Sequence, residues 1–143
     1  MEIAVNEWLL HYLVPGSIHL GNAFKFLDAL ERRGDRMAIR YDSPWTRKLY
    51  RISKASYVHA QALRRIAMML HDEARVHLVY EDEIVPLPDG VECPADDRYL
   101  VELAYSVPNK TILTTDNPLR EALRKYDLVT VLLVEDFLPT YVT

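Results

Sequence analysis

The chain has 143 residues, of which 50% are hydrophobic and 27% charged, and its formal net charge is −4. This length suits one globular domain with a core of its own, and the composition excludes a disordered or fibrous protein. Because Cys93 is the only cysteine, an internal disulfide and a thiolate-rich zinc site are excluded as well.

The first half of the chain predicts two strands and two long helical segments. In chain order we expect a strand at residues 3–5 leading into a short helix, a helix at 20–33, a strand at 37–41 and a helical pattern over 45–71. Pro15 and Gly16 stop the first helix, and Gly34 ends the second, in which apolar residues recur every three or four positions.

The second half predicts three strands and two helices. In chain order we expect a strand at 76–80, a surface loop at 81–94, a helix from Asp96 or Asp97, a strand at 111–115, a helix at 118–126 and a strand at 129–134. The loop holds three prolines, one glycine and five acids, so we expect it to be flexible and to contribute nothing to the core.

Apolar strands that alternate with helices predict an α/β fold. We expect a three-layer α/β/α sandwich around a mostly parallel sheet of four to five strands. The sequence shows no internal repeat and no linker, so a single domain should span residues 1–143. No apolar run approaches the roughly 18 residues of a membrane span, and the N-terminus lacks the pattern of a signal peptide, so we expect a cytoplasmic protein with no membrane contact.

Four acidic residues stand where such a sheet builds its sites. Glu7 follows the first expected strand, Asp42 the second and Asp116 the fourth, while Asp97 begins a helix. The carboxyl ends of parallel strands line one crevice, so we expect these four to converge there as catalytic and metal-binding residues. Their oxygens suit Mg²⁺ or Mn²⁺, which can activate water for phosphodiester hydrolysis. The alternative for each acid is a helix N-cap.

Other common site chemistries lack their signatures. The five histidines show no paired spacing on one helix, which argues against a zinc hydrolase. With only four glycines, the chain has no glycine-rich loop for phosphates or dinucleotides.

Charge is unevenly distributed along the chain. Residues 31–65 hold ten basic and three acidic residues, whereas residues 72–103 hold ten acidic and two basic ones. The basic segment also carries aromatic residues, and this mixture suits the phosphates and bases of single-stranded RNA. The candidates are Arg47, Lys48, Arg51 and Lys54 for the phosphates, and Trp45, Tyr50 and Tyr57 for the bases. The alternative is that the aromatic residues are core and the cations only solvate helix faces.

Two runs of the sequence resemble the C-terminal half of a PIN domain. In residues 96–104, DDRYLVELA, Asp97 opens a helix and Ala104 follows seven residues later. In residues 111–119, TILTTDNPL, Asp116 ends a Thr-x-Asp motif after a strand. The opening residues 3–10, IAVNEWLL, are similar to the first strand and helix of the same family.

This resemblance implies a Mg²⁺- or Mn²⁺-dependent ribonuclease. Asp97 and Asp116 would bind the metal, with Glu7 and Asp42 as further ligands. A small PIN-like chain also implies the toxin of a toxin–antitoxin pair, with RNA as the substrate, an antitoxin or other protein as partner, and a homodimer through an apolar face.

The sequence departs from the family pattern at the first strand, and this opens two alternatives. The family has an Asp there, whereas this chain has Ala4 or Asn6, depending on the alignment. One alternative is therefore a catalytically degenerate PIN-like domain that binds RNA or a protein without cleavage. The other is an interaction module whose acidic loop, residues 81–94, contacts a basic partner.

Overall fold

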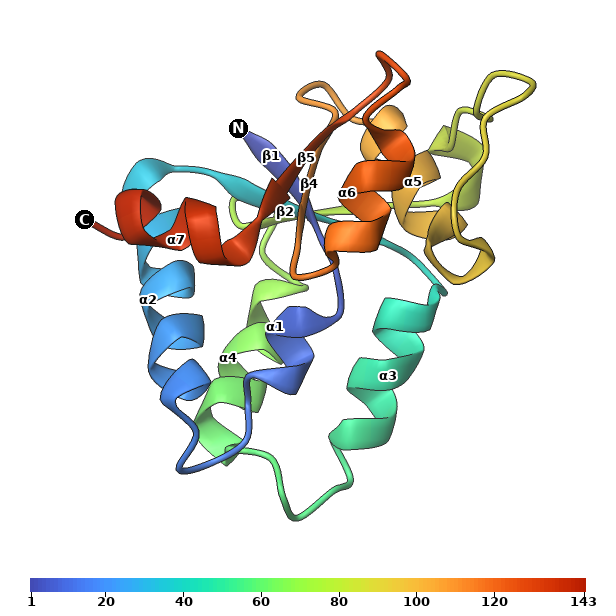
Figure 1. Ribbon diagram of the computed structural model, residues 1–143. Coiled ribbons are helices and arrows are strands. Elements are labelled where there is room, and N and C mark those ends of the chain that lie inside the picture. The colour runs from blue at the N-terminus through green and yellow to red at the C-terminus, as the bar shows by residue number, and fades with distance from the viewer.

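The computed structural model describes residues 1–143 as a central sheet covered by helices on both faces (Figure 1). The strands are β1 (Glu2–Val5), β2 (Arg36–Arg40), β3 (Val76–Val79), β4 (Thr111–Thr114) and β5 (Thr130–Leu133). The helices are α1 (Trp8–His11), α2 (Ile18–Arg33), α3 (Pro44–Ile52), α4 (Ala60–Met69), α5 (Arg98–Tyr105), α6 (Asn117–Leu123) and α7 (Val134–Tyr141). Two short 3-10 turns, η1 (Glu81–Glu83) and η2 (Ala95–Asp97), follow β3 and precede α5.

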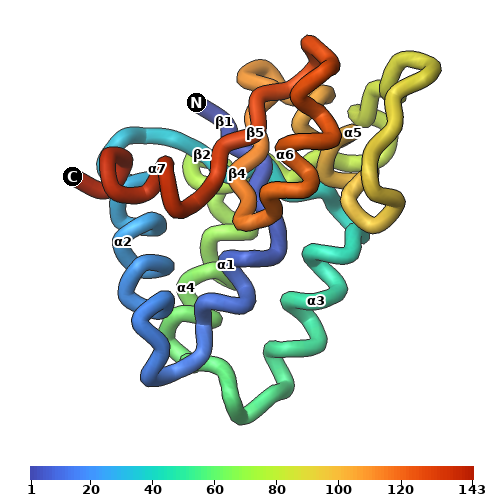
Figure 2. Tube along the Cα trace, in the orientation of Figure 1, coloured from blue at the N-terminus to red at the C-terminus, as the bar shows by residue number.

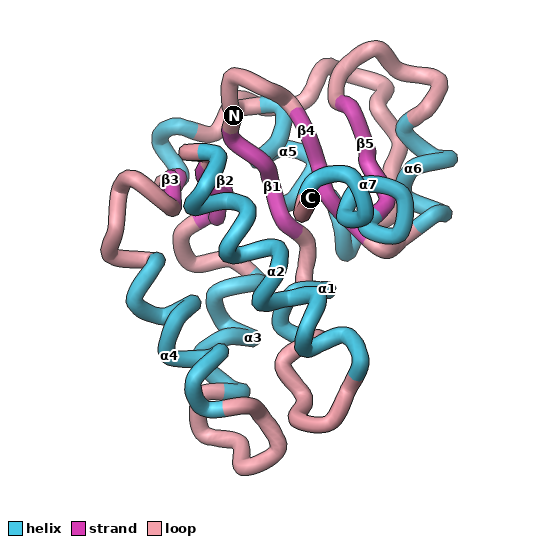
Figure 3. Tube along the Cα trace, turned by 90° about the vertical axis from the view of Figure 1, so that its left-hand side faces the viewer, coloured by secondary structure: helices cyan, strands magenta, loops and turns pink.

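All five strands are parallel, in the order β3-β2-β1-β4-β5 (Figure 3). Ile3 pairs with Met37 on one side of β1, and Ala4 pairs with Ile112 on the other. The chain therefore builds the sheet outward from β1 in one direction and then returns to build it in the other. The junction between β1 and β4 is the topological switch point, where open α/β sheets leave a crevice at their carboxyl edge.

The sheet separates two hydrophobic cores because successive side chains of a strand point to opposite faces. Ile3 and Val5 enter the larger core, which packs against α1, α2, α3, α4 and α7, whereas Ala4 enters the smaller core under α5 and α6. The expected three-layer α/β/α fold with a parallel sheet is confirmed.

Local side-chain bonds fix the starts of α2 and α3. Ser17 caps α2 by accepting a hydrogen bond from the His19 amide, and that helix ends at Gly34, whose φ of 71° is easily adopted only without a side chain. Ser43 and Thr46 form a capping box at the start of α3. The capping box sets where α3 leaves the carboxyl end of β2.

Two expectations about the helices were wrong. The single helical pattern over residues 45–71 is two helices, α3 and α4, because residues 53–59 form a loop between them. The chain also does not end in a strand, since α7 begins directly after β5 and continues through Pro139.

The loop after β3 is not the free segment that its composition predicts. It runs beside α5, as the yellow part of the trace shows (Figure 2), and the Val85 amide donates to Ser106 Oγ at 2.8 Å. Leu87 and Val91 are buried in the smaller core. Leu87 and Val91 therefore attach this loop to the smaller core, although most of its residues are prolines, acids and other residues typical of a surface loop.

No helix in the structure is both long and apolar enough to cross a lipid bilayer.

Candidate functional site

A cavity of about 460 Å³ opens at the carboxyl edge of the sheet beside the switch point. We call it the acidic cavity, and its lining consists of Asn6, Glu7, Pro44, Ala95, Asp96, Asp97 and Tyr99. The end of β1 is joined to β4 here, because the Asn6 amide donates to the Leu113 carbonyl at 3.1 Å. The acidic cavity thus lies where sheet topology alone predicts a crevice.

Asp116 is held at this edge by two local hydrogen bonds. Its amide donates to Thr114 Oγ1 at 3.0 Å, and its Oδ1 accepts the Leu119 amide at 3.1 Å as the N-cap of α6. The N-cap alternative is therefore correct for Asp116. It uses only one of the two carboxylate oxygens, so the other can serve as a ligand.

Asp97 lies across from Asp116 and makes no capping bond, although it stands at the N-cap position of α5. Its pKa is raised to about 6 by partial burial and then by the charge of Asp116, a side-chain hydrogen bond to Asp116, and the charges of Asp96 and Glu7. Neither Asp97 nor Asp116 has a cation partner among the ion pairs of the chain. Two carboxyl groups distant in sequence thus share negative potential that nothing in the chain neutralises.

Asn6 has a structural task at the same edge. Its Nδ2 donates to Thr114 Oγ1 at 3.0 Å, and its Oδ1 accepts the Glu7 amide at 2.7 Å. The amide side chain links the ends of β1 and β4 and positions Thr114, which in turn bonds the Asp116 amide.

Glu7 lines the acidic cavity but faces a cation. Lys48 Nζ lies 4.0 Å from Glu7 Oε2, and it also contacts Nε2 of His11. Burial and the charge of Lys48 lower the pKa of His11. Glu7 is therefore the one predicted ligand in the acidic cavity whose charge is offset from within the chain.

Tyr99 is a cavity residue that sequence reasoning missed. Its hydroxyl is buried without a hydrogen-bond partner, and burial together with the charges of Glu7 and Asp97 raises its pKa. The hydroxyl therefore stays protonated and is a free donor beside the two acids. Its position two residues after Asp97 was the only signal in the sequence.

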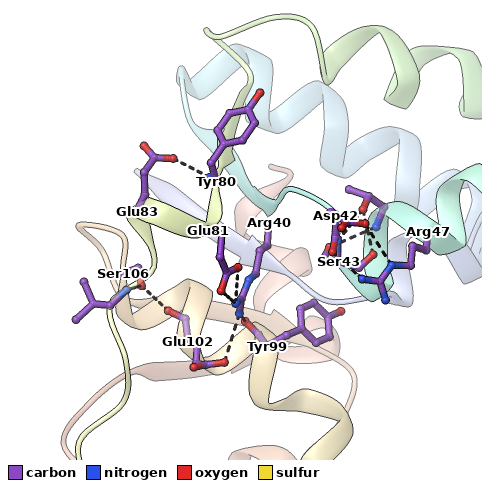
Figure 4. A network of polar contacts seen from close by, with 12 residues as sticks. Arg40, Asp42, Ser43, Arg47, Tyr80, Glu81, Glu83, Tyr99, Glu102 and Ser106 are labelled. Atoms are coloured by element: carbon purple, nitrogen blue, oxygen red, sulfur yellow. Dashed lines mark hydrogen bonds and ion pairs between the residues drawn. The ribbon is translucent and has the colours of Figure 1, made fainter.

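Asp42 is not brought to the acidic cavity. Its backbone has φ 50°, and its exposed side chain pairs with Arg47, whose Nε lies 3.4 Å from Asp42 Oδ1 (Figure 4). The cap of α3 is Ser43 rather than Asp42. Asp42 instead lines a separate groove beside α3.

Of the four predicted ligands, Asp97 and Asp116 therefore come together, and Glu7 lines the same cavity. Asp42 lies elsewhere. No three His, Cys, Asp or Glu side chains gather closely enough to hold a metal ion by themselves. Asp97 and Asp116 fit an ion such as Mg²⁺, which commonly takes one or two protein carboxylates, keeps several waters and accepts phosphate oxygens.

Both tryptophans lie under this site. Trp8 Nε1 donates to the Leu113 carbonyl at 2.9 Å, and Trp45 Nε1 donates to the Asn6 carbonyl at 3.3 Å. Trp45 is only 1% exposed, so the expectation that it stacks on RNA bases was wrong and the core alternative holds for it. Its ring supports the end of β1.

The predicted RNA-binding cations divide into two groups. Arg47 and Arg51 line the groove beside α3, and Lys54 lies over the ring of Tyr50, with its Nζ 4.4 Å from the ring centroid. Lys48 instead turns toward Glu7. The cationic side chains of α3 therefore lie in two places: Arg47 and Arg51 lie in the groove, and Lys48 lies at the acidic cavity.

Comparison of the chain with protein-family models, curated proteins and solved structures finds no match.

Proposed function

We propose that the chain is a metal-dependent ribonuclease in which Asp97 and Asp116 hold Mg²⁺ or Mn²⁺ at the switch point between β1 and β4. The observation that carries the proposal is the meeting of these two carboxyl groups with no cation partner. Partial burial and then the charge of Asp116 raise the pKa of Asp97 to about 6. Asp97 and Asp116 would hold the divalent ion, which would offset their charges and would supply Lewis acidity and an activated water for phosphodiester hydrolysis.

The chain's own residues would position the RNA. The Tyr99 hydroxyl, which has no partner, can donate to a phosphate oxygen in the acidic cavity. Arg47 and Arg51 on the adjacent α3 provide positive charge along the approach. Asn6 keeps the ends of β1 and β4 together and so fixes the spacing of the two metal-binding acids.

The wider setting belongs to the same proposal. We place the activity in the cytoplasm, with a protein antitoxin as the partner that restrains it and with homodimerisation through an apolar face, as the resemblance to PIN toxins implies.

The decisive experiment is RNA cleavage with Mn²⁺ by the wild type and Asp116→Asn. Asparagine is also a good N-cap, so this change keeps the start of α6 while it removes the ligand charge. We expect cleavage to fall by at least about 100-fold, because even outer partners of metal ligands contribute about 10- to 100-fold. Asp127→Asn is the matched control, since Asp127 is exposed and lies at the opposite end of the strands. Equal cleavage by Asp116→Asn, or no cleavage by the wild type, would contradict the proposal.

A second function is favoured by two features of the acidic cavity. The side-chain amide of Asn6 is bonded to Thr114 and to the backbone of Glu7, and Lys48 offsets the charge of Glu7, so Asp97 and Asp116 are the two predicted ligands left for a metal. These features suit a PIN-like domain that binds RNA without cutting it. RNA binding in EDTA, with intact RNA after incubation with Mn²⁺, would select this second function.

A further inference from the structure

An open groove of about 1130 Å³ lies beside the acidic cavity, between α3 and the carboxyl ends of β2 and β3. We call it the tyrosine groove. The residues on which the argument rests are Tyr41, Arg47, Tyr50, Arg51, Leu78 and Tyr80. Small-molecule pockets measure roughly 300–1,000 Å³, so this groove is large enough for an extended ligand.

Three tyrosines make the groove unusual for a solvated surface. Tyr41, Tyr50 and Tyr80 are 54%, 65% and 47% exposed, and they come from the end of β2, from α3 and from the end of β3. Exposed aromatic rings that gather from three elements mark an interaction site rather than a core.

The rings are arranged for stacking. The centroids of Tyr41 and Tyr80 are 4.8 Å apart with 33° between the ring planes, so the two form one aromatic wall. The Tyr80 ring points away from the Arg40 network (Figure 4), and that network does not cover it. Tyr50 provides a third ring from α3, and the Lys54 ammonium lies over one face of this ring.

Cationic groups border the same rings. The Arg51 side chain makes no hydrogen bond or ion pair. Arg47 pairs only with the exposed Asp42, and water screens that pair. Asp42 is the only carboxylate in the lining, so the groove favours an anion. Guanidinium groups bind phosphate oxygens in a bidentate manner and stack on planar rings.

We infer that the tyrosine groove is a binding site for the unpaired bases of single-stranded RNA, with Arg47 and Arg51 on the flanking phosphates. Aromatic rings take bases of any sequence, and only unpaired bases can reach them. The inference rests on the proposed function in taking RNA as the ligand.

The groove and the acidic cavity adjoin at Pro44, which lines both. A strand whose bases occupy the tyrosine groove therefore passes Pro44 toward Asp97. The groove would hold the part of the RNA next to the reacting phosphate, and it would select single strands over duplexes.

The test is equilibrium binding of a single-stranded RNA oligonucleotide in EDTA at low salt, with a duplex of the same sequence as competitor. We expect the wild type to prefer the single strand and Tyr50→Ala to bind it about five-fold to 100-fold more weakly, the range for loss of one stacking ring. Tyr50→Phe, which keeps the ring, should bind within about two-fold of the wild type.

Tyr57→Ala is the matched control for Tyr50→Ala. Tyr57 is 60% exposed and lies in the loop between α3 and α4, outside the groove, although the sequence also suggested it as a stacking residue. It should bind like the wild type. Equal losses in Tyr50→Ala and Tyr57→Ala would overturn the inference, and so would equal affinity for single strand and duplex.

Charge is tested by a second matched pair. Arg51→Gln should weaken binding and reduce the salt dependence by about one phosphate contact, whereas Arg64→Gln, on the exposed surface of α4, should do neither. Equal salt dependence in the two variants would show that Arg51 contacts no phosphate and would overturn the inference.

These measurements are independent of cleavage, since EDTA removes any divalent ion. If Asp116→Asn binds RNA normally and the wild type does not cut it, the groove inference stands while the nuclease proposal fails. If the wild type cuts RNA but Tyr50→Ala binds it equally well, the reverse holds. Absence of any RNA binding would overturn the groove inference and leave the tyrosines as a surface for a protein partner.

Discussion

The acids at the carboxyl edge of the sheet form two groups that differ in what faces them. Beside β2 and β3, Arg40 pairs with Glu81 at 2.9 Å and with Glu102 at 3.4 Å (Figure 4), and Asp42 has Arg47. Beside β1 and β4, Asp97 and Asp116 face each other. The acids look alike in the sequence, but only the second group lacks a counter-ion within the chain. A missing counter-ion therefore distinguishes a candidate ligand from a structural acid.

The largest expected effect comes from removing Arg40, the counter-ion of Glu81 and Glu102. Arg40→Met should lower the free energy of unfolding by about 2 kcal/mol, because the Arg40 side chain is nearly buried and holds Glu102 and the Tyr99 carbonyl. The value is below that of a fully buried pair, since Glu81 is exposed and can be solvated. Urea unfolding at pH 7 measures it. A loss below about 0.5 kcal/mol would mean that this network is no stronger than a surface pair.

The next largest effect is a pH dependence of stability at Asp97, one of the two acids without a counter-ion. Because the pKa of Asp97 is about 6 in the fold and 3.8 in the unfolded chain, its charge destabilises the fold increasingly as the pH rises from about 4 to beyond 6. In EDTA, Asp97→Asn should match the wild type near pH 4 and be about 1 kcal/mol more stable at pH 7, allowing for solvent screening of this half-exposed group.

Urea unfolding between pH 4 and pH 7 tests this, with Asp127→Asn, at an exposed acid away from the site, as the control variant. A constant difference between Asp97→Asn and the wild type would mean that neither burial nor Asp116 raises the pKa of Asp97. Mn²⁺ should stabilise the wild type more at pH 7 than at pH 5, since protonation of Asp97 competes with the ion.

A smaller effect is expected at Lys48, whose ammonium group lies near Glu7 in the acidic cavity. Lys48→Met leaves Glu7 without its partner and should strengthen Mn²⁺ binding about three-fold, the size expected for one partly solvated ion pair. Titration calorimetry measures the affinity, and Lys25→Met, on the exposed side of α2, should not change it.

The same variant has a second readout. Because Lys48 lowers the pKa of His11, Lys48→Met should raise that pKa in an NMR titration. An unchanged His11 pKa would show that the Lys48 ammonium does not occupy this position in solution.

The smallest effect is expected for the exposed pair. Arg47→Met should change the free energy of unfolding by less than about 0.5 kcal/mol, because Arg47 and Asp42 are both largely solvated. Measured beside Arg40→Met, it shows how much of the difference between the two arginines comes from burial. A loss as large as that of Arg40→Met would remove the distinction.

The sheet was predictable from short runs rich in β-branched and apolar residues. The runs predicted at residues 3–5, 37–41 and 111–115 overlap β1, β2 and β4, whose central residues are buried. The start of α7 was missed because β5 passes into it with no turn residue between them. The break between α3 and α4 contains neither glycine nor proline, so the helical pattern seemed to continue.

Sheet topology allowed the sequence to predict that the site lies at the carboxyl edge, but not which side chains turn toward it. A parallel sheet with residues after its strands brings Asp116 and Asp97 to one edge, and the sequence motifs marked both. Asp42 also follows a strand, but its left-handed backbone and the Ser43 cap turn it outward, which strand position alone does not reveal. The groove tyrosines were mostly missed, because the pairing of Tyr41 with Tyr80 depends on strand order.

The two indole bonds beneath the acidic cavity have a practical consequence. The only tryptophans of the chain, Trp8 and Trp45, are both anchored to the strand ends that carry the site. Their intrinsic fluorescence therefore reports this region without an attached label. A paramagnetic ion bound at Asp97 would quench that emission whereas Mg²⁺ would not, so occupancy can be followed separately from unfolding in a single cuvette.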